Sequence, residues 1–283
     1  MSGAAPARQR RLIVNADDLG LSTLVNDGIE EAVRAGAVTS ASLMVNTPGF
    51  DDAVRRSHAL PRLSLGLHFN LTTGRSVAPA SSVPSLLDGA GRFLSLSGLL
   101  RRALLGGVRP GEVRVEADAQ LARLRAAGIV PTHADSHRHV HAFPAMRGAL
   151  AAAAAAAGVK FVRRPLEPLL ARPWGAAGIT KRALLAAAWA VPSTGPSPVP
   201  GTASFRGIAL LGVKSFEADL VTLLDALPLG STELMVHPGK NDPSVAQWDP
   251  YVAERAVELA ALLSPRVRER LARGDFELTR FGA

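Results

Sequence analysis

The sequence predicts an α/β fold, an irregular TIM-like (β/α) barrel of about seven strands. Short β-rich runs alternate with helix-forming stretches, a pattern that favours a mostly parallel sheet. Acidic or histidine side chains follow strands of four different strand–helix units, namely Asp17, Asp18, His68, His137 and His237. In a barrel these strand ends surround one mouth, whereas an open sheet would hold the outer ones far apart. No Gly-x-Gly-x-x-Gly fingerprint follows the first strand, which disfavours a dinucleotide-binding sheet.

The predicted strands are short apolar runs bounded by residues that favour turns. In chain order they cover residues 11–16, 38–45, 63–67, 129–134, 159–162, 203–211 and 232–236, with a short terminal strand at 276–279. Several runs end directly at a polar residue, as the first does at Asp17 and the third at His68. Polar positions therefore recur at the carboxyl ends of strands.

Helix-forming stretches separate these strands. In chain order they cover residues 23–35, a short segment through 53–54, 112–127, 144–157, a patch near 179–189, 217–227 and 252–263. Ser22 can cap the first helix and Gly36 can end it, while Pro144 suits the first position of another helix. Two excursions leave the barrel at about 74–110 and 165–201. We expect residues 1–283 to form a single domain.

Composition excludes several classes of protein. The chain has 283 residues and no cysteine, which excludes disulfides and thiolate sites and is compatible with a cytoplasmic protein. Its apolar runs are too short for a signal peptide or a membrane span. A net charge of +8 invites a nucleic-acid hypothesis, but the arginines are scattered, with small clusters only at 8–11 and 163–164, and the single tyrosine provides no stacking platform. We expect no nucleic-acid partner, and the Arg- and Ala-rich helices could pair in a homodimer.

Residues 132–141 read Thr-His-Ala-Asp-Ser-His-Arg-His-Val-His and hold four of the seven histidines. An extended chain would place the odd-numbered residues on one side, namely His133, Asp135, His137, His139 and His141. A helix would align only three of the histidines. Pro131 and Pro144 favour a strand that ends near Asp135, a loop that carries the histidines, and a helix from Pro144. Because imidazole is the commonest metal ligand at neutral pH, we favour metal binding over a solvated polar loop or a hydrogen-bonded structural cluster.

One carboxylate and two imidazoles, with positions left open to water and substrate, suit a catalytic divalent ion. Such an ion lowers the pKa of a bound water from 15.7 toward about 7. The adjacent carboxylates of Asp17 and Asp18 could then have different roles, one binding the metal and the other accepting the proton of the water. His237 could protonate the leaving group. The alternative is that Asp17 and Asp18 form only a charge pair before a helix.

These motifs resemble those of the YdjC-like carbohydrate deacetylases, which include the chitooligosaccharide deacetylases and the hopanoid-associated HpnK-type proteins. The resemblance rests on Asn-Ala-Asp-Asp-Leu-Gly at 15–20, on 38–40 with 44–46, on Gly-Leu-His at 66–68, on 132–141 and on 236–238. The sequence departs from the commonest pattern at Leu19, where many members have phenylalanine. It also departs at Arg138, where the chitooligosaccharide group often has histidine. Both departures bear on the substrate rather than on the proposed metal ligands.

The resemblance implies metal-dependent removal of acetyl from an N-acetylated amino sugar of an oligosaccharide or a glycolipid head group, on a distorted barrel. Position by position it implies a general base at Asp17 and, as ligands of one divalent ion, Zn²⁺ or Mg²⁺, the side chains of Asp18, His68 and His137. His237 becomes a candidate acid or oxyanion stabiliser. Side chains that support the ligands or touch the substrate are then His133, Asp135, His139 and His141. Asn70, close behind His68, is a further candidate substrate contact.

Two rival functions stay open at this point. Two histidines and a carboxylate also describe non-haem iron enzymes, although those generally use β-rich folds. The chain could instead be a non-catalytic regulator that binds a sugar or a metal on the same barrel. A binder has little reason to keep a base beside a metal ligand, so Asp17 next to Asp18 favours an enzyme.

Overall fold

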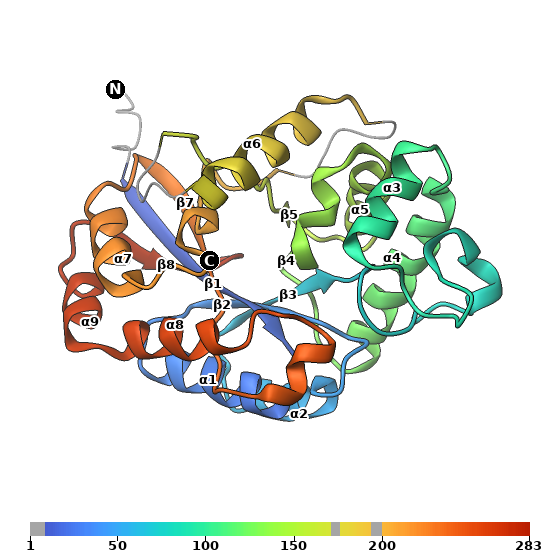
Figure 1. The fold of residues 1–283 in the computed structure, drawn as a ribbon. Coiled ribbons are helices and arrows are strands. Elements are labelled where there is room, and N and C mark those ends of the chain that lie inside the picture. Colours follow the sequence, from blue (N-terminus) through green and yellow to red (C-terminus); the bar gives the residue numbers. More distant parts are fainter. Residues whose placement is uncertain (1–8, 171–175, 194–199) are drawn as a thin grey trace, which may run out of the picture.

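Eight strands of the described chain form one curled parallel sheet with helices around its outer side (Figure 1). A computed structural model describes residues 9–170, 176–193 and 200–283. The strand order is β5-β4-β3-β2-β1-β7-β6, and β8 pairs with the first part of β1. The strands are β1 Arg10–Leu19, β2 Ser40–Leu43, β3 Ser64–Phe69, β4 His133–Ser136, β5 Phe161–Val162, β6 Ser204–Arg206, β7 Gly230–Val236 and β8 Glu277–Thr279. The seven strands of this path form a half-barrel, which confirms the predicted irregular TIM-like barrel.

Helices surround the sheet, and α6 lies across one end of it (Figure 1). The α-helices are α1 Thr23–Arg34, α2 Phe50–Ser57, α3 Leu96–Leu104, α4 Pro110–Ala126, α5 Pro144–Ala156, α6 Ala176–Ala190, α7 Phe216–Asp225, α8 Ala253–Leu263 and α9 Pro265–Leu271. Short 3₁₀ helices are η1 Ala80–Ser82, η2 Pro84–Leu86, η3 His137–Ala142, η4 Ile208–Leu210 and η5 Pro243–Gln247. Within the described residues, every helix is too short or too polar to cross a membrane.

Local signals of the sequence set the ends of the first helix. The side chain of Ser22 accepts a hydrogen bond from the backbone N–H of Val25 at 3.2 Å, which satisfies one of the free donors of α1. Gly36, two residues beyond the last helical residue, has a φ of +76°, a conformation that glycine adopts without strain. Val25, Ile29 and Ala32 are buried against the sheet. The predicted cap, stop and apolar face of this helix are confirmed.

The central strand β1 separates the hydrophobic core from the inside of the half-barrel. Successive side chains of a strand point to opposite faces. Leu12, Val14 and Ala16 are fully buried in the main hydrophobic cluster, between the sheet and the helices. Asn15 and Asp17 are equally buried but lie on the other face, where they hydrogen-bond to each other. Polar side chains therefore fill the carboxyl end of the barrel interior.

Several predicted strands differ in length from the observed ones. The strands predicted at 38–45 and 159–162 are shorter, covering 40–43 and 161–162. The prediction at 203–211 is wrong after Arg206, because the chain turns at Gly207 and continues as η4. Gly207 has a φ of +122°, and a Cβ atom there would lie 2.4 Å from the carbonyl oxygen of Met235, so only glycine fits without a shift of the backbone. This turn moves the following segment away from the sheet.

The first predicted excursion packs on α4. The carboxylate of Glu116 accepts hydrogen bonds from the backbone N–H groups of Val77 and Ala78 at 2.9 and 3.0 Å. Phe93 and Leu99 of the same segment are buried in the main core. In the second excursion, residues 171–175 and 194–199 lie outside the described residues, and α6 occupies most of the remainder.

Candidate metal and catalytic site

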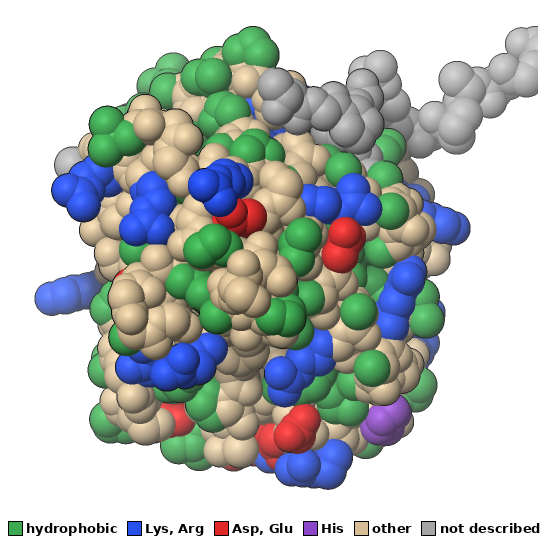
Figure 2. Space-filling model, turned by 90° about the vertical axis from the view of Figure 1, so that its right-hand side faces the viewer, with side chains coloured by type: hydrophobic (Ala, Val, Ile, Leu, Met, Phe, Trp, Pro, Cys, Tyr) green, Lys and Arg blue, Asp and Glu red, His purple; other side chains and the backbone are tan. Residues whose placement is uncertain are grey.

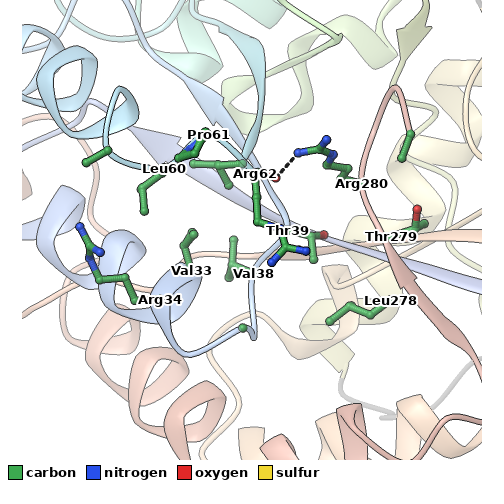
Figure 3. Close-up of a pocket in the computed structure, with 14 residues that line it drawn as sticks. Val33, Arg34, Val38, Thr39, Leu60, Pro61, Arg62, Leu278, Thr279 and Arg280 are labelled. Atoms are coloured by element: carbon green, nitrogen blue, oxygen red, sulfur yellow. Dashed lines mark hydrogen bonds between the residues drawn. The ribbon is translucent and has the colours of Figure 1, made fainter.

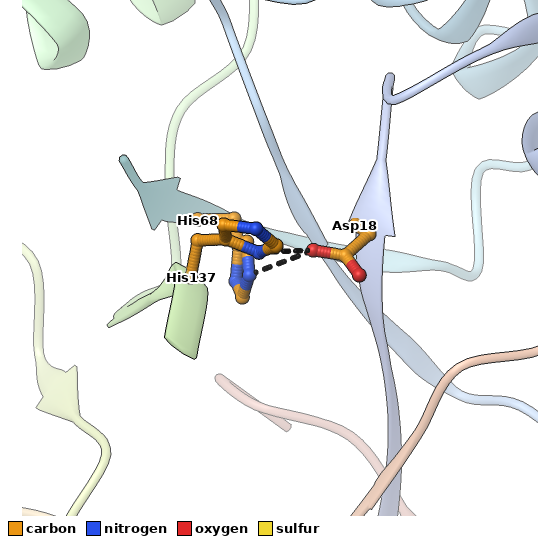
Figure 4. Close-up of side chains that lie close together, drawn as sticks. All are labelled: Asp18, His68 and His137. Atoms are coloured by element: carbon orange, nitrogen blue, oxygen red, sulfur yellow. Dashed lines mark hydrogen bonds and ion pairs between the residues drawn. The ribbon is translucent and has the colours of Figure 1, made fainter. Parts of the chain in front are cut away.

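One carboxylate oxygen of Asp18 faces two neighbouring imidazoles at the carboxyl end of the sheet (Figure 4). Its Oδ1 atom is 3.0 Å from Nε2 of His68, at the end of β3, and 2.9 Å from Nδ1 of His137, the first residue of η3. All three side chains are almost completely buried. Strand and loop positions that are far apart in the sequence thus converge on one point, as the barrel hypothesis predicts.

An irregularity of β1 allows adjacent aspartates to share the site. The pairing of β1 with β2 shifts register between Ala16 and Leu19, and Asp18 has a φ of +65°. A regular strand would send the side chains of Asp17 and Asp18 to opposite faces. The left-handed conformation is costly for a residue other than glycine and typically occurs where function requires it. Both carboxylates consequently line one cavity.

Asp135 orients the ring of His68. The Nδ1 atom of His68 is 2.6 Å from Oδ1 of Asp135 and 3.2 Å from Oγ of Ser42, which leaves Nε2 directed at Asp18. Burial acts to lower the pKa of His68, but the carboxylates of Asp135 and Asp17 outweigh it and raise this pKa to about 10. A carboxylate behind a ligating histidine is the usual arrangement at metal sites, because it fixes the ring and strengthens the ligand.

Asp18, His68 and His137 offer donor atoms that fit a divalent cation. One carboxylate oxygen and two ring nitrogens lie within 4.8 Å of one another. Nε2 of His137 is buried without a hydrogen-bond partner among the described residues. Nitrogen and carboxylate donors suit Zn²⁺ and related ions, with positions left for water and substrate. Geometry and donor chemistry together therefore allow a metal centre here.

Arg163 holds the second aspartate of the pair. Its Nη1 and Nη2 atoms each lie 2.6 Å from an oxygen of Asp17, while Nη2 is 2.7 Å from Asp135 and Nε is 2.7 Å from Glu233. Burial alone would raise the pKa of Asp17, yet the charge of Arg163 holds it well below its usual range. Asp17 is therefore ionised and fixed in orientation by two parallel hydrogen bonds.

Arg255 performs the same role for Asp18. Its Nη2 atom is 2.6 Å from Oδ2 of Asp18 and 3.0 Å from Oδ2 of Asp249. Burial favours the neutral form of Asp18, but Arg255 and His137 outweigh it, so the pKa of Asp18 lies well below its usual range. Asp249 is also 3.9 Å from Nε2 of His137. One oxygen of Asp18 is thus held by arginine while the other faces the imidazoles.

His237 follows β7 and reaches the site from the side of β1 opposite to β3 and β4. Glu258 of α8 accepts a hydrogen bond from the backbone N–H of His237 at 2.6 Å and lies 3.6 Å from its Nδ1 atom. Tyr251 donates its hydroxyl hydrogen to the same carboxylate at 2.6 Å, and its ring centre is 5.3 Å from that of His237. These contacts place an imidazole at the cavity wall with a carboxylate behind it.

A cavity of about 430 Å³ opens onto these groups. Its walls include Asp17, Asp18, His68, His137, Arg138, His139, Lys181, His237, Asp249 and Tyr251. A larger cavity of about 790 Å³ lies at the opposite, amino end of the strands (Figure 3). Its described lining residues include Arg34, Arg62 and Arg280 but no histidine and no acidic side chain. Of these two cavities, the smaller one therefore holds the acidic and imidazole side chains that acid–base or metal chemistry needs.

Comparison with known proteins identifies the family. A model of the family described as YdjC-like protein matches residues 11–273. The chain belongs to the YdjC-like family. It is 37% identical to a carbohydrate deacetylase of Homo sapiens (95% of this chain and 89% of that protein) and 34% identical to one of Geobacillus stearothermophilus (95% and 96%). It is 31% identical to a chitooligosaccharide deacetylase of Yersinia pestis, with 96% of this chain and 98% of that protein aligned.

A solved structure shares the fold of this YdjC-like protein. The crystal structure of a putative cellobiose-phosphate cleavage protein from Enterococcus faecalis superposes with a TM-score of 0.77 at 26% identity. The match covers 96% of this chain and 98% of the other. The half-barrel is therefore known from an experimental structure.

The remaining predicted site residues of this YdjC-like protein divide between two locations. His139 lines the site cavity, and Nε2 of His141 lies 3.0 Å from the carbonyl oxygen of Arg163, so both lie at or directly behind the site. His133 lies deeper in the barrel, where its ring stacks on Phe281 at 4.1 Å between ring centres. Asn70 uses its side-chain oxygen to accept hydrogen bonds from the backbone of its own turn. Neither His133 nor Asn70 belongs to the described lining of the site cavity.

Sequence reasoning missed the residues that hold the carboxylates. It noted 163–164 only as a small arginine cluster and gave Arg163 no role in the site, although this side chain is only 1% exposed, whereas Arg164 is exposed. On the face that Figure 2 draws, lysine and arginine side chains are dispersed among hydrophobic and neutral ones, as the scattered arginines of the sequence predict, but Arg182 and Arg255 are also buried. A signal for Arg163 was present in Glu233, a buried acidic residue directly before the apolar residues 234–236 of β7, because a carboxylate in such a position favours a cationic partner.

Proposed function

We propose that the chain is a metal-dependent carbohydrate deacetylase that hydrolyses the acetamide of an N-acetylated amino sugar. The observation that carries this proposal is the pairing of two adjacent aspartates with different partners, Asp18 facing two imidazoles and Asp17 held by Arg163. The names of the aligned relatives support the same reaction and a sugar substrate. We assign Asp18, His68 and His137 as ligands of one Zn²⁺ or Mg²⁺ ion.

The ion, when bound, supplies Lewis acidity that polarises a carbonyl and lowers the pKa of a water molecule. Asp17 accepts the proton of the attacking water, because it is ionised and lies in the wall of the same cavity. Arg163 keeps the Asp17 carboxylate in one orientation throughout. As the carbon–nitrogen bond breaks, His237 donates a proton to the leaving amine, and the carboxylate of Glu258 stabilises the charged imidazole. Acetate and the free amino sugar are the products.

Acetate release from N-acetylglucosamine compounds tests this function. The panel includes chitobiose and a glycosylated lipid, with metal-stripped protein alone and with added Zn²⁺ or Mg²⁺. Added metal should restore release. Asp17→Asn should lower kcat by at least about a hundredfold while leaving metal binding unchanged, since general-base catalysis contributes that much. If Asp17→Asn retained full turnover, or if one bound metal per chain gave no release from any compound, the proposal would fail.

A further inference from the structure

Lys181 of α6 lines the site cavity and is partly buried. The other lysines of the chain are all exposed, namely Lys160, Lys214 and Lys240. Lys181 lies one turn before Leu185, a buried residue that packs in a small cluster with Phe205. Because residues i and i+4 of a helix share a face, Lys181 is directed inward, toward the cavity that it lines.

Contacts near both ends of α6 fix the helix that carries this lysine. Arg182 is only 1% exposed and donates a hydrogen bond to the carbonyl oxygen of Pro168 at 2.9 Å. Arg147 of α5 donates one to the carbonyl oxygen of Trp189 at 2.8 Å, and its guanidinium lies 4.7 Å from the ring centre of the same residue. These neighbours therefore hold Lys181 in place before any ligand binds.

The ammonium group of Lys181 lacks a partner of its own. The aspartates of the cavity wall are already paired with arginine, Asp17 with Arg163, and Asp18 and Asp249 with Arg255. Among the described residues, Lys181 makes neither a hydrogen bond nor an ion pair. Burial lowers its pKa, and the carboxylates of Asp249 and Asp17 offset this only in part. A partly desolvated cation of this kind favours a ligand that carries negative charge.

The proposed reaction creates negative charge at one place on its substrate. As water attacks the acetamide, its oxygen forms a bond to the carbonyl carbon, and the π electrons of the carbonyl group move to the acyl oxygen. The negative charge stays on the acyl group when acetate is formed. The hydroxyl groups of the sugar remain neutral, and the leaving nitrogen takes up a proton. A cation in the cavity wall therefore gains most at the acyl oxygen.

We propose that Lys181 donates a hydrogen bond to this acyl oxygen and stabilises the oxyanion, an inference that rests on the proposed deacetylation. Lys181 keeps its proton throughout, while Asp17 takes the proton of water and His237 supplies one to the amine. A charged donor that is already in position needs no reorganisation during the reaction. The excursion at 165–201 then contributes a catalytic residue to the site.

Steady-state hydrolysis by the metal-loaded protein tests this role, with release of the free amine as the readout. Lys181→Met should lower kcat by about a hundredfold or more with KM unchanged, because the interaction strengthens in the transition state. Lys181→Arg keeps a charged donor and should restore kcat to within about tenfold of the parent. Added acetate should inhibit Lys181→Met about tenfold more weakly than the parent, since a hydrogen bond to the anion is lost.

Two controls accompany these assays. Lys214→Met should hydrolyse the substrate like the parent, because Lys214 is exposed and lies outside the lining of the cavity. Urea unfolding should give Lys181→Met the midpoint of the parent, since the variant removes a charge without a described partner. If Lys181→Met were unfolded, Lys181→Gln would take its place in every assay.

Unreduced kcat in Lys181→Met, a change confined to KM, or unchanged inhibition by acetate would overturn the role of Lys181. Each of these results leaves the deacetylation itself intact, because the parent still releases the amine. If the metal-loaded parent released no amine from any compound of the panel, the deacetylation would be refuted and the role of Lys181 with it.

Discussion

Replacing Arg163 with glutamine leaves three buried carboxylates without their shared cation. In the folded chain Arg163 lies 2.6 to 2.7 Å from oxygens of Asp17, Asp135 and Glu233, and all four side chains are at most 2% exposed. Removing one partner of a buried ion pair typically costs about 3–5 kcal/mol, because the other charge stays desolvated. We therefore expect Arg163→Gln to lower the free energy of unfolding by about 4 kcal/mol at pH 7.

The loss of unfolding free energy caused by Arg163→Gln should become smaller as the pH falls. Arg163 holds the pKa of Asp17 and Asp135 below their unfolded values, against the effect of burial. Their contribution to stability is thus present above about pH 4 and disappears as the pH falls below it. In the variant the pKa of each carboxyl rises, so these groups take up protons on folding. The difference in unfolding free energy between the parent and Arg163→Gln should therefore decrease as the pH falls from 7 to 5.

Urea unfolding at pH 7 and pH 5 measures this gap. With a slope of about 3 kcal/mol per molar urea, a loss of 4 kcal/mol lowers the midpoint by somewhat more than about 1 M. Arg164→Gln is the matched control, because the neighbouring side chain is exposed and should change stability by less than about 0.5 kcal/mol. Equal unfolding free energies for the two variants at pH 7 would refute the buried-cation argument.

Three further outcomes follow from the geometry. Burial raises the pKa of Glu233 to about 7, so the free energy of unfolding should fall as the pH rises from about 5 to 7. In urea titrations at several pH values, Glu233→Gln should make the free energy of unfolding less dependent on pH, and an unchanged pH dependence would contradict this expectation. Glu258→Gln removes the carboxylate beside His237, so kcat should fall by about tenfold or more while KM stays unchanged. A rise in KM with kcat unchanged would instead indicate that Glu258 contributes to substrate binding. Zn²⁺ at about a hundred times its Kd should stabilise the stripped protein by about 2.7 kcal/mol in thermal unfolding, and the variant Asp18→Asn, His68→Gln should show no such rise if these side chains are the ligands.

The sequence predicted those site residues whose position follows from the strand ends alone. Asp17, His68 and His137 lie where strands of a parallel barrel finish, so recognising the strands places them at one end of the barrel. That Asp18 shares the cavity with Asp17 depends on the register shift of β1 and the left-handed conformation of Asp18, which the strand pattern does not predict. The arginines could not be found this way. Arg255 reaches Asp18 across 237 residues from the first turn of a helix, and nothing in local periodicity distinguishes it from the exposed arginines of other helices.

Secondary structure was predicted best where the local chain alone determines it. The cap at Ser22 and the proline at the start of α5 act through their nearest neighbours, and both helices begin as expected. Strands β5 and β6 lie at the two ends of the sheet and are short, and for β6 the reason is a tertiary contact. The close approach of Gly207 to Met235 ends β6, and a contact of that kind is invisible before the chain folds. For the same reason, the sequence could not predict which arginine pairs with each aspartate.

The pairing of β1 also affects the order of events during synthesis. This strand is made before the other described strands of the sheet, yet it pairs with β7 at residues 230–236 and with β8 at residues 277–279. Contacts between such distant segments form slowly and only after the later segment has emerged. The edge of β1 that pairs with β7 therefore stays unpaired until residues 230–236 have been made, whereas its other edge can pair with β2 early. We expect the site around Asp17 and Asp18 to be completed late in folding, because Arg255, which holds Asp18, lies beyond β7 in the chain.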